Sequence, residues 1–249
     1  MKRLERGFCM TNPIYLALDF PTWCETKQFI DTYDLHGVPV KVGMELFYRE
    51  GPKVIDKLKA NNHSIFLDLK LHDIPNTVMR AMRNIAALDV DIVNVHALGG
   101  SEMIKWAKEG LLLGGTGKDT KLIAVTILTS ISDQTMNEEL RLNGSVNEIA
   151  SHLANLSYES GADGVVCSVH ETKRIKQVCG PSFLTVTPGI RLNQSDKNDQ
   201  RRIATPLEAR KQGSDILVIG RSITKAENPK KAYEQALEEW NRGYESGNC

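Results

Sequence analysis

Residues 66–77, FLDLKLHDIPNT, combine the alternation of a β-strand with four titratable side chains. Because successive side chains of a strand point to opposite faces, the three leucines share one face, and Asp68 and Lys70 share the other. Asp73 follows shortly after them. Carboxylates and amines are the groups that bind charged substrates and transfer protons. The stretch therefore predicts a strand that packs its leucines on one side and presents its charges to a reaction site.

Two other apolar runs carry a charged residue near their end. Asp19 ends IYLALD, and Lys41 lies in VPVKVGM, in phase with a glycine. With Asp68 and Lys70 these residues give four charges of alternating sign, and Asp73 completes the spacing DxKxxD. Buried ion pairs that fix strand register are the alternative interpretation. Removing one partner of such a pair costs about 3–5 kcal/mol, yet apolar replacements are often as stable, so a functional role is favoured.

The alternating signs indicate the chemistry. A lysine held among carboxylates keeps its proton, because opposite charges favour its charged form. Lys70 is therefore a poor Schiff-base nucleophile but a good proton donor to a carbon base. Clustered carboxylates repel an anionic group of a bound substrate, and this repulsion is relieved in a transition state in which that group leaves the substrate. The pattern predicts proton delivery to a carbanion, as in decarboxylation or enolate chemistry.

The elements that must position these groups are short apolar runs separated by helix-like segments, such as 77–89, 145–161 and 228–244. This alternation matches a (β/α)8 barrel. A doubly wound open sheet is the rival, but ALDFPTW stands where a GxGxxG motif would follow the first strand. The predicted strands are 14–19, 38–44, 64–70, 91–97, 121–128, 164–168, 183–189 and 215–221.

We therefore predict the α/β class and a single-domain (β/α)8 TIM barrel over residues 12–243. An N-terminal tail (1–11) and a C-terminal tail (244–249) would flank it. Catalytic groups of this fold lie at the carboxyl ends of the strands, so the charged residues would meet at one mouth of the barrel.

The last two predicted strands indicate a phosphate site. They end in TPGIR and VIGRSI, and the loops after strands seven and eight of such barrels commonly bind phosphate. Gly189 and Gly220 allow close backbone approach, while Arg191 and Arg221 supply forked donors. The polar loop 192–202 is either a disordered surface loop or a lid, and the arginines on each side favour a lid.

Bulk composition argues against several other classes. Lysine plus arginine equal aspartate plus glutamate at 31 each, so no overall field favours nucleic acid or an anionic membrane. No apolar run is long enough to span a membrane, and the basic N-terminus lacks the apolar core of a secretory signal. Five scattered cysteines without a CxxC pair favour a reduced, cytoplasmic protein without a zinc site.

The motifs ALDF, KVGMELF, FLDLKLHDIPNTV, VNVHA, TILTS, TPGIR and VIGRSI occur in this order. With them the sequence resembles the bacterial orotidine 5′-phosphate decarboxylase family, from about Ile14 to Lys230. The resemblance implies decarboxylation of orotidine 5′-phosphate to UMP and CO2, the last step of pyrimidine nucleotide synthesis. It also implies a homodimer and a reaction without cofactor or metal.

The resemblance also implies roles for single residues. Lys70 would protonate C6 of the pyrimidine, and Asp68 would lie beside the substrate carboxylate. Lys41 and Asp19 would hold the ribose hydroxyls and complete the charge network.

Further roles concern the base, the phosphate and the partner subunit. Thr129 would contact the pyrimidine, and Gln200 would bridge base and phosphate. The expected phosphate ligands are Arg191, Gly220 and Arg221, and the residues expected to reach the neighbouring subunit's site are Asp73, Ile74 and Thr77.

Two other functions remain to be tested. 3-Keto-gulonate phosphate decarboxylase and hexulose phosphate synthase share the DxKxxD barrel but use Mg²⁺ and an enediolate. They carry an acidic residue in place of Lys41, so Lys41, IPNT and ILTS argue against them. A non-catalytic phosphate-binding barrel would have no need of four charges at its mouth. An Mg²⁺ bound by two barrel carboxylates is also conceivable, but the interleaved lysines would compete with it. His72 and His96 lie at strand ends, and structural roles are favoured for both.

Overall fold

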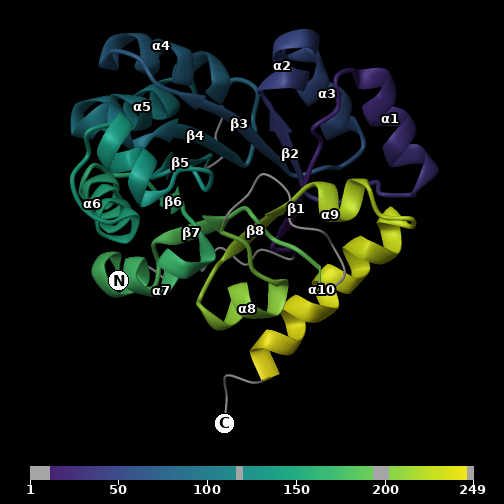
Figure 1. Cartoon of the computed structure of the whole chain (residues 1–249). Coiled ribbons are helices and arrows are strands. Elements are labelled where there is room, and N and C mark those ends of the chain that lie inside the picture. Colours follow the sequence, from purple (N-terminus) through teal and green to yellow (C-terminus); the bar gives the residue numbers. More distant parts are fainter. Residues whose placement is uncertain (1–11, 116–119, 193–201, 246–249) are drawn as a thin grey trace, which may run out of the picture.

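The eight predicted apolar runs form the strands of a closed parallel barrel in the computed structural model (Figure 1). The structure describes residues 12–115, 120–192 and 202–245. Neighbouring strands follow one another in sequence, and β1 pairs with β8, so the rival open sheet is wrong. The strands are β1 (Ile14–Ala17), β2 (Val40–Gly43), β3 (Ile65–Leu71), β4 (Ile92–His96), β5 (Lys121–Val125), β6 (Gly164–Val166), β7 (Leu184–Thr187) and β8 (Ile216–Ile219).

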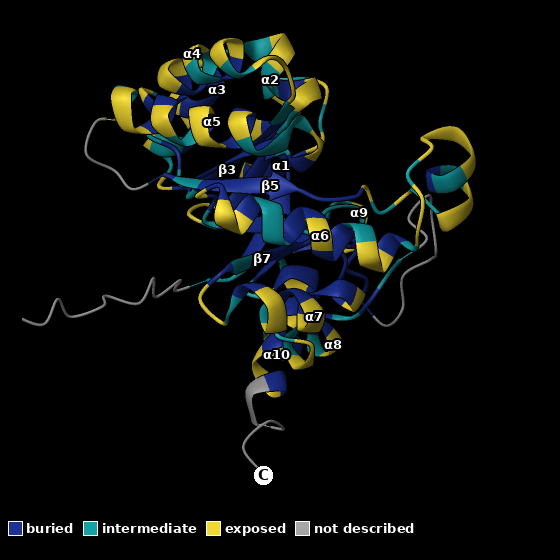
Figure 2. Cartoon of the chain, turned by 90° about the vertical axis from the view of Figure 1, so that its left-hand side faces the viewer, coloured by how far each residue is buried: buried dark blue, intermediate teal, exposed yellow. Residues whose placement is uncertain are grey.

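Helices surround the barrel, and their outer faces are exposed while the strands are buried (Figure 2). The helix-like segments 77–89, 145–161 and 228–244 correspond to α4, α6 and α10, which confirms the alternation. The helices are α1 (Trp23–Thr32), α2 (Met44–Glu50), α3 (Lys53–Ala60), α4 (Pro75–Ala86), α5 (Gly100–Gly114), α6 (Val146–Glu159), α7 (Val169–Cys179), α8 (Pro206–Lys211), α9 (Arg221–Thr224) and α10 (Pro229–Glu245), with a 3-10 turn η1 (Ala97–Gly99) and a π-helical turn η2 (Thr135–Glu139).

Capping residues and prolines mark the first turns of several of these helices. Ser145 begins α6 with a capping box, in which its backbone N–H donates to Glu148 and its hydroxyl accepts from the Glu148 N–H. Thr205 and Glu208 repeat the arrangement at α8. Proline is the first residue of α4, α8 and α10, where its missing N–H is harmless.

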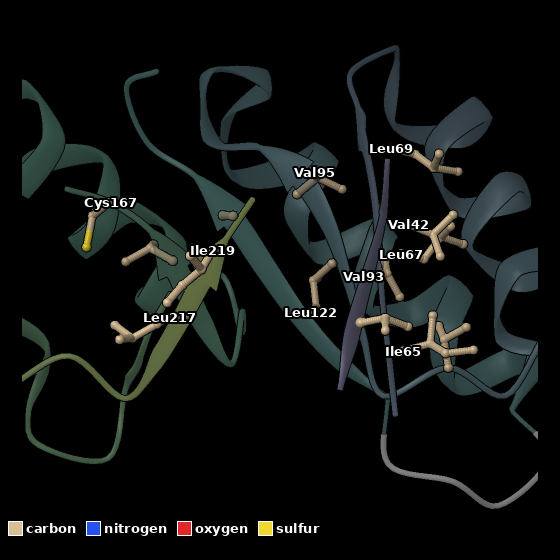
Figure 3. Packing of buried hydrophobic residues seen from close by; sticks show 14 of the residues in the cluster. Val42, Ile65, Leu67, Leu69, Val93, Val95, Leu122, Cys167, Leu217 and Ile219 are labelled. Atoms are coloured by element: carbon tan, nitrogen blue, oxygen red, sulfur yellow. The ribbon is translucent and has the colours of Figure 1, made fainter. Parts of the chain in front are cut away.

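The two faces of the strands fill two separate layers. Leu67 and Leu69 pack outward against the helices, together with Val93 and Val95 (Figure 3), as the alternation predicted. The inward-facing side chains form a second, packed layer inside the barrel. This inner layer consists of Tyr15, Ala17, Phe66, Ile92, Ile123, Val186, Ile216 and Val218.

Three aspartates close the amino-terminal end of the barrel. Asp91, Asp163 and Asp215 each precede an even-numbered strand by one residue, and each accepts a backbone N–H near the start of the preceding odd-numbered strand, at 2.7–2.8 Å. The Asp215 carboxylate also accepts from the hydroxyl of Thr185 and from Lys176 Nζ, at 2.9 and 2.6 Å. These carboxylates occupy donors that would otherwise lack a partner at the strand ends.

The expected tails lie outside the described residues, apart from 244 and 245, which continue α10. Among the described residues, none of the helices combines the length and apolar character needed to cross a membrane.

Replacing Asp215 with alanine should lower the free energy of unfolding by about 2 kcal/mol, because the Thr185 N–H and Lys176 lose their acceptor. The measurement is urea denaturation followed by circular dichroism. Asp34→Ala, which removes an exposed ion pair with Lys230, should leave the midpoint unchanged. Equal midpoints for the two variants would contradict the role given to Asp215.

Candidate active site

A cavity of about 760 Å³ opens at the carboxyl ends of the strands. Its wall includes side chains from β1, β2, β3 and the loops that follow β5, β7 and β8. The predicted site residues that line it are Asp19, Lys41, Asp68, Lys70, Thr129, Arg191, Gly220 and Arg221.

Asp68 is the centre of the charged part of this wall. Its Oδ1 accepts from Lys70 Nζ at 2.6 Å, and its Oδ2 lies 3.2 Å from Lys41 Nζ. Lys41 Nζ also donates to Asp19 Oδ1 at 3.0 Å. A side chain at Gly43 would place its Cβ 3.2 Å from Lys41 Nζ and 3.3 Å from Asp19 Oδ1, so glycine leaves room for this pair. The structure therefore joins the four predicted charges into one chain of alternating sign.

The chain of charges determines the protonation states. Burial opposes ionisation of Asp68, but the ammonium groups of Lys41 and Lys70 outweigh it and hold the Asp68 pKa below its ordinary value. Burial likewise opposes the charge of Lys41, but Asp68 and Asp19 outweigh it and raise the Lys41 pKa. A lowered carboxyl pKa stabilises the fold above the unfolded value of about 3.8, and this contribution is lost as the pH falls through the lower folded value.

The end of β3 departs from the strict alternation that the sequence predicted. Leu67 pairs with Val93 and Leu71 with Val95, so β3 carries extra residues between these pairs. Lys70 has a φ of 52°, in the left-handed region that non-glycine residues rarely adopt. Such a bulge re-aims side chains, and here Lys70 Nζ meets the carboxylate of Asp68.

Asn94 on β4 holds this bulge, and the sequence analysis missed it. Its Oδ1 accepts the backbone N–H of Lys70 at 2.8 Å, and its Nδ2 donates to Asp68 Oδ1 at 2.6 Å. Asn94 is fully buried. The available signal was a polar amide in VNVH, on the inward face of an otherwise apolar strand. A buried amide needs partners, and strained backbone persists only where its surroundings hold it.

The phosphate-site residues come from two loops that contact each other. The backbone N–H of Arg191 donates to Ala204 O, and its Nη1 donates to Ile190 O, both at 2.9 Å. The hydroxyl of Ser222, in α9, donates to the same Ile190 carbonyl at 3.2 Å. The loop after β7 is thereby tied to the helix that Arg221 begins.

Other cavity residues were not predicted. Thr224 and Lys225 lie about one helical turn after Arg221 and line the cavity; that spacing was the available signal. The remaining wall is largely apolar and includes Val125, Ile127, Val166, Cys167, Pro188 and Val218. A wall that combines charged and apolar side chains suits an organic ligand that carries both an apolar part and a charged group.

Three predicted residues do not line this cavity. Asp73, Ile74 and Thr77 are exposed, and Asp73 Oδ1 accepts the backbone N–H of Ile74 at 2.6 Å. They are absent from the wall of this chain's own cavity. Gln200 lies outside the described residues.

The two histidines at strand ends form a ring contact instead of a ligand group. The rings of His72 and His96 have centroids 5.6 Å apart. Within residues 12–115, 120–192 and 202–245, no three His, Cys, Asp or Glu side chains gather where they could hold a metal ion.

Comparison with known sequences identifies close relatives. The sequence profile of the orotidine 5′-phosphate decarboxylase / HUMPS family matches residues 12–236. The orotidine 5′-phosphate decarboxylases of Bacillus cytotoxicus and Bacillus mycoides are each 54% identical over 233 residues, which cover 93% of this chain and 98% of each relative.

Solved structures with a similar fold also include an orotidine 5′-phosphate decarboxylase. The crystal structure of orotidine 5′-phosphate decarboxylase from Lactobacillus acidophilus superposes with a TM-score of 0.83 at 45% identity, covering 92% of this chain and 99% of that one. An uncharacterized conserved protein from Geobacillus kaustophilus gives a TM-score of 0.81 at 45% identity, covering 92% of this chain and 100% of that one.

Replacing Asn94 with alanine should lower the free energy of unfolding by about 1–3 kcal/mol, because the Lys70 N–H and Asp68 lose a buried partner. Denaturant titration at neutral pH measures this difference. Asn147→Ala, on the exposed side of α6, serves as the matched control. A variant at position 94 as stable as that control would contradict the positioning role.

Proposed function

Because the chain belongs to the orotidine 5′-phosphate decarboxylase / HUMPS family, we propose that it converts orotidine 5′-phosphate to UMP and CO2 in this cavity. The observation that carries the proposal is the Asp68 carboxylate held between Lys41 and Lys70 at the carboxyl ends of the strands. The arrangement supplies a carboxylate that can repel the carboxylate of the substrate, and beside it an ammonium group that can protonate the carbon left behind.

The charges give each residue a role in the reaction. The substrate carboxylate lies beside Asp68, and their repulsion is relieved as CO2 leaves. The C–C bond breaks with its electron pair remaining on C6 of the pyrimidine, and Lys70 Nζ gives its proton to that carbon. Preorganised charges stabilise the carbanion without rearranging during the step. Lys41 and Asp19 hold the ribose hydroxyls and keep the charge network together.

The remaining cavity residues bind the parts of the substrate that do not react. Arg191, Gly220 and Arg221 take the phosphate, Thr129 contacts the pyrimidine, and Gln200 bridges base and phosphate. Binding energy from the remote phosphate can organise the charged site, which raises the rate as well as the affinity. The reaction needs no cofactor in this account, since the electrostatics of the site take the place of an electron sink.

The residues outside the cavity serve a partner subunit. Asp73, Ile74 and Thr77 of one subunit complete the active site of the other in a homodimer. Their exposure supports this, with Ile74 67% exposed. Apolar Leu98, Trp106 and Leu113 are also exposed on the segment from η1 through α5, which packs against α4.

The enzyme works in the cytoplasm. The described cysteines Cys24, Cys167 and Cys179 are free thiols, which suits a reducing compartment.

The Mg²⁺-dependent half of the family is the second candidate. It is less well supported, because Lys41 donates to Asp19 and pairs with Asp68, whereas an acidic residue is expected at this position in that group. A non-catalytic phosphate-binding barrel is also less well supported, because it has no use for buried charges at its mouth.

Purified protein should decarboxylate orotidine 5′-phosphate, followed by the ultraviolet change as the carboxylate is lost. Lys70→Ala should lower kcat/KM by at least about 1,000-fold, equivalent to about 4 kcal/mol of transition-state stabilisation. Lys27→Ala, on the exposed face of α1, should match the wild type.

Either of two results would overturn the proposal: no turnover by the wild type, or normal turnover by Lys70→Ala. The same assay with EDTA decides between the candidates. Full activity after chelation is expected, whereas lost activity would favour the Mg²⁺-dependent reaction.

The shared active site predicts complementation between two inactive variants. Lys70→Ala and Asp73→Ala homodimers should each be nearly inactive. A mixed dimer places both changes in one site and leaves the other intact. Equal mixing with free exchange should therefore restore about one quarter of wild-type activity, since half the dimers are mixed. Activity that stays at the level of the parents would show that Asp73 serves its own subunit.

A further inference from the structure

An ion pair between a buried carboxylate and a half-buried arginine lies beside the cavity, apart from the reacting charges. Glu171 is in the first turn of α7, and its side chain is fully buried. Arg202 Nη1 donates to Glu171 Oε1. Burial raises the pKa of the Glu171 carboxyl, and the charge of Arg202 opposes this rise. Burying a charge in this way is unfavourable unless its partners are well placed.

Glu171 connects this pair to the segment after β6. Its Oε2 accepts the backbone N–H of Ser168 at 2.8 Å, which closes the start of α7. Cys167, the residue before Ser168, lines the cavity. The Glu171 carboxylate therefore bonds to the segment after β6, directly beside a residue of the cavity wall.

Arg202 connects the pair to the segment after β5. Its Nη2 donates to Leu128 O at 3.1 Å and lies 3.5 Å from Ile127 O. Thr126, just before them and just after the end of β5, still bonds to β6, where its N–H and hydroxyl donate to Val166 O at 3.2 and 2.9 Å. Beyond that point the chain leaves the sheet, and the Leu128 carbonyl accepts both the Ile131 N–H at 3.0 Å, within its own turn, and the Arg202 guanidinium from another loop.

The supported segment is a wall of the cavity. Ile127, Leu128, Thr129 and Ser130 are consecutive, and all four line it. Arg202 holds the carbonyl immediately before Thr129. We propose that Glu171 and Arg202 are a positioning pair that sets the place of Thr129 in the cavity, and thereby the affinity for the pyrimidine base. The identity of the base rests on the proposed function.

The arginine is specific to this task because it uses its two terminal nitrogens for different partners. A lysine could still pair with Glu171, but its single ammonium could not also reach the Leu128 carbonyl in the fork geometry. Arg202→Lys therefore separates the two contacts: it retains a charge opposite Glu171 and loses the bridge to the Thr129 segment.

The experiment compares two ligands that share the ribose phosphate and differ in the base. Calorimetric titration of Arg202→Lys should show the Kd for UMP raised about tenfold, and the Kd for ribose 5-phosphate should stay within about twofold of wild type. Arg174→Lys, an exposed arginine on the same helix as Glu171, should behave as wild type with both ligands. An equal loss of affinity for both ligands, or none for UMP, would overturn the proposal.

A double-mutant cycle tests whether the effect passes through Thr129. Thr129→Ala should also weaken UMP selectively, and adding Arg202→Lys to it should cost much less than Arg202→Lys alone. Additive losses would show that Arg202 acts elsewhere. Glu171→Gln, which keeps an acceptor for Arg202, should give a smaller UMP-selective loss than Arg202→Lys.

A ligand-free readout keeps this inference separate from the proposed function. Amide hydrogen exchange of the peptide covering 126–131 should be faster in Arg202→Lys than in wild type, and unchanged in Arg174→Lys. Unchanged exchange in Arg202→Lys would overturn the positioning role. Failure of the wild type to bind UMP or to turn over orotidine 5′-phosphate would overturn the function instead.

Discussion

The whole site depends on one unfavourable requirement, which is that Asp68 must be ionised while nearly buried. An isolated carboxylate in this position would take up a proton. Two ammonium groups and one amide prevent that, and each comes from a different place: Lys41 from β2, Lys70 from the end of β3 and Asn94 from β4. Parallel pairing of β2, β3 and β4 in this order brings the three strands side by side with their carboxyl ends at the same edge. The barrel is therefore the means by which the chain keeps charges together in a dry place.

The two ends of the barrel use carboxylates in different ways. At the amino-terminal end, Asp91, Asp163 and Asp215 accept backbone N–H groups, which satisfies donors and stabilises the strands. At the carboxyl end, Asp68 pairs with two lysines and lines the cavity. This division matches the general behaviour of the fold, in which one end carries stability and the other carries chemistry. The packed inner layer around Phe66 and Tyr15 separates them.

Much of this was predictable from the sequence because strand alternation and strand order are read directly from apolar patterns. The closed barrel, the outward leucines and the meeting of Asp19, Lys41, Asp68 and Lys70 all follow from that. The bulge was not predictable, because it depends on Asn94, a partner that lies 24 residues from Lys70 in the sequence. The role of Arg202 was not predictable for a related reason. Its hydrogen bond goes to a backbone carbonyl on another loop, and any residue type at that position offers the same carbonyl.

The central claim is that the Asp68 carboxyl is ionised because two lysines hold it so. Carbon-13 NMR of aspartate-labelled protein measures this directly, with Asp68→Asn identifying the resonance. The account predicts that the pKa of the Asp68 carboxyl lies below its ordinary value of 3.8, so that the group takes up a proton only at lower pH. A midpoint above that value would mean that burial dominates over the lysines, and the charged site as described would not exist.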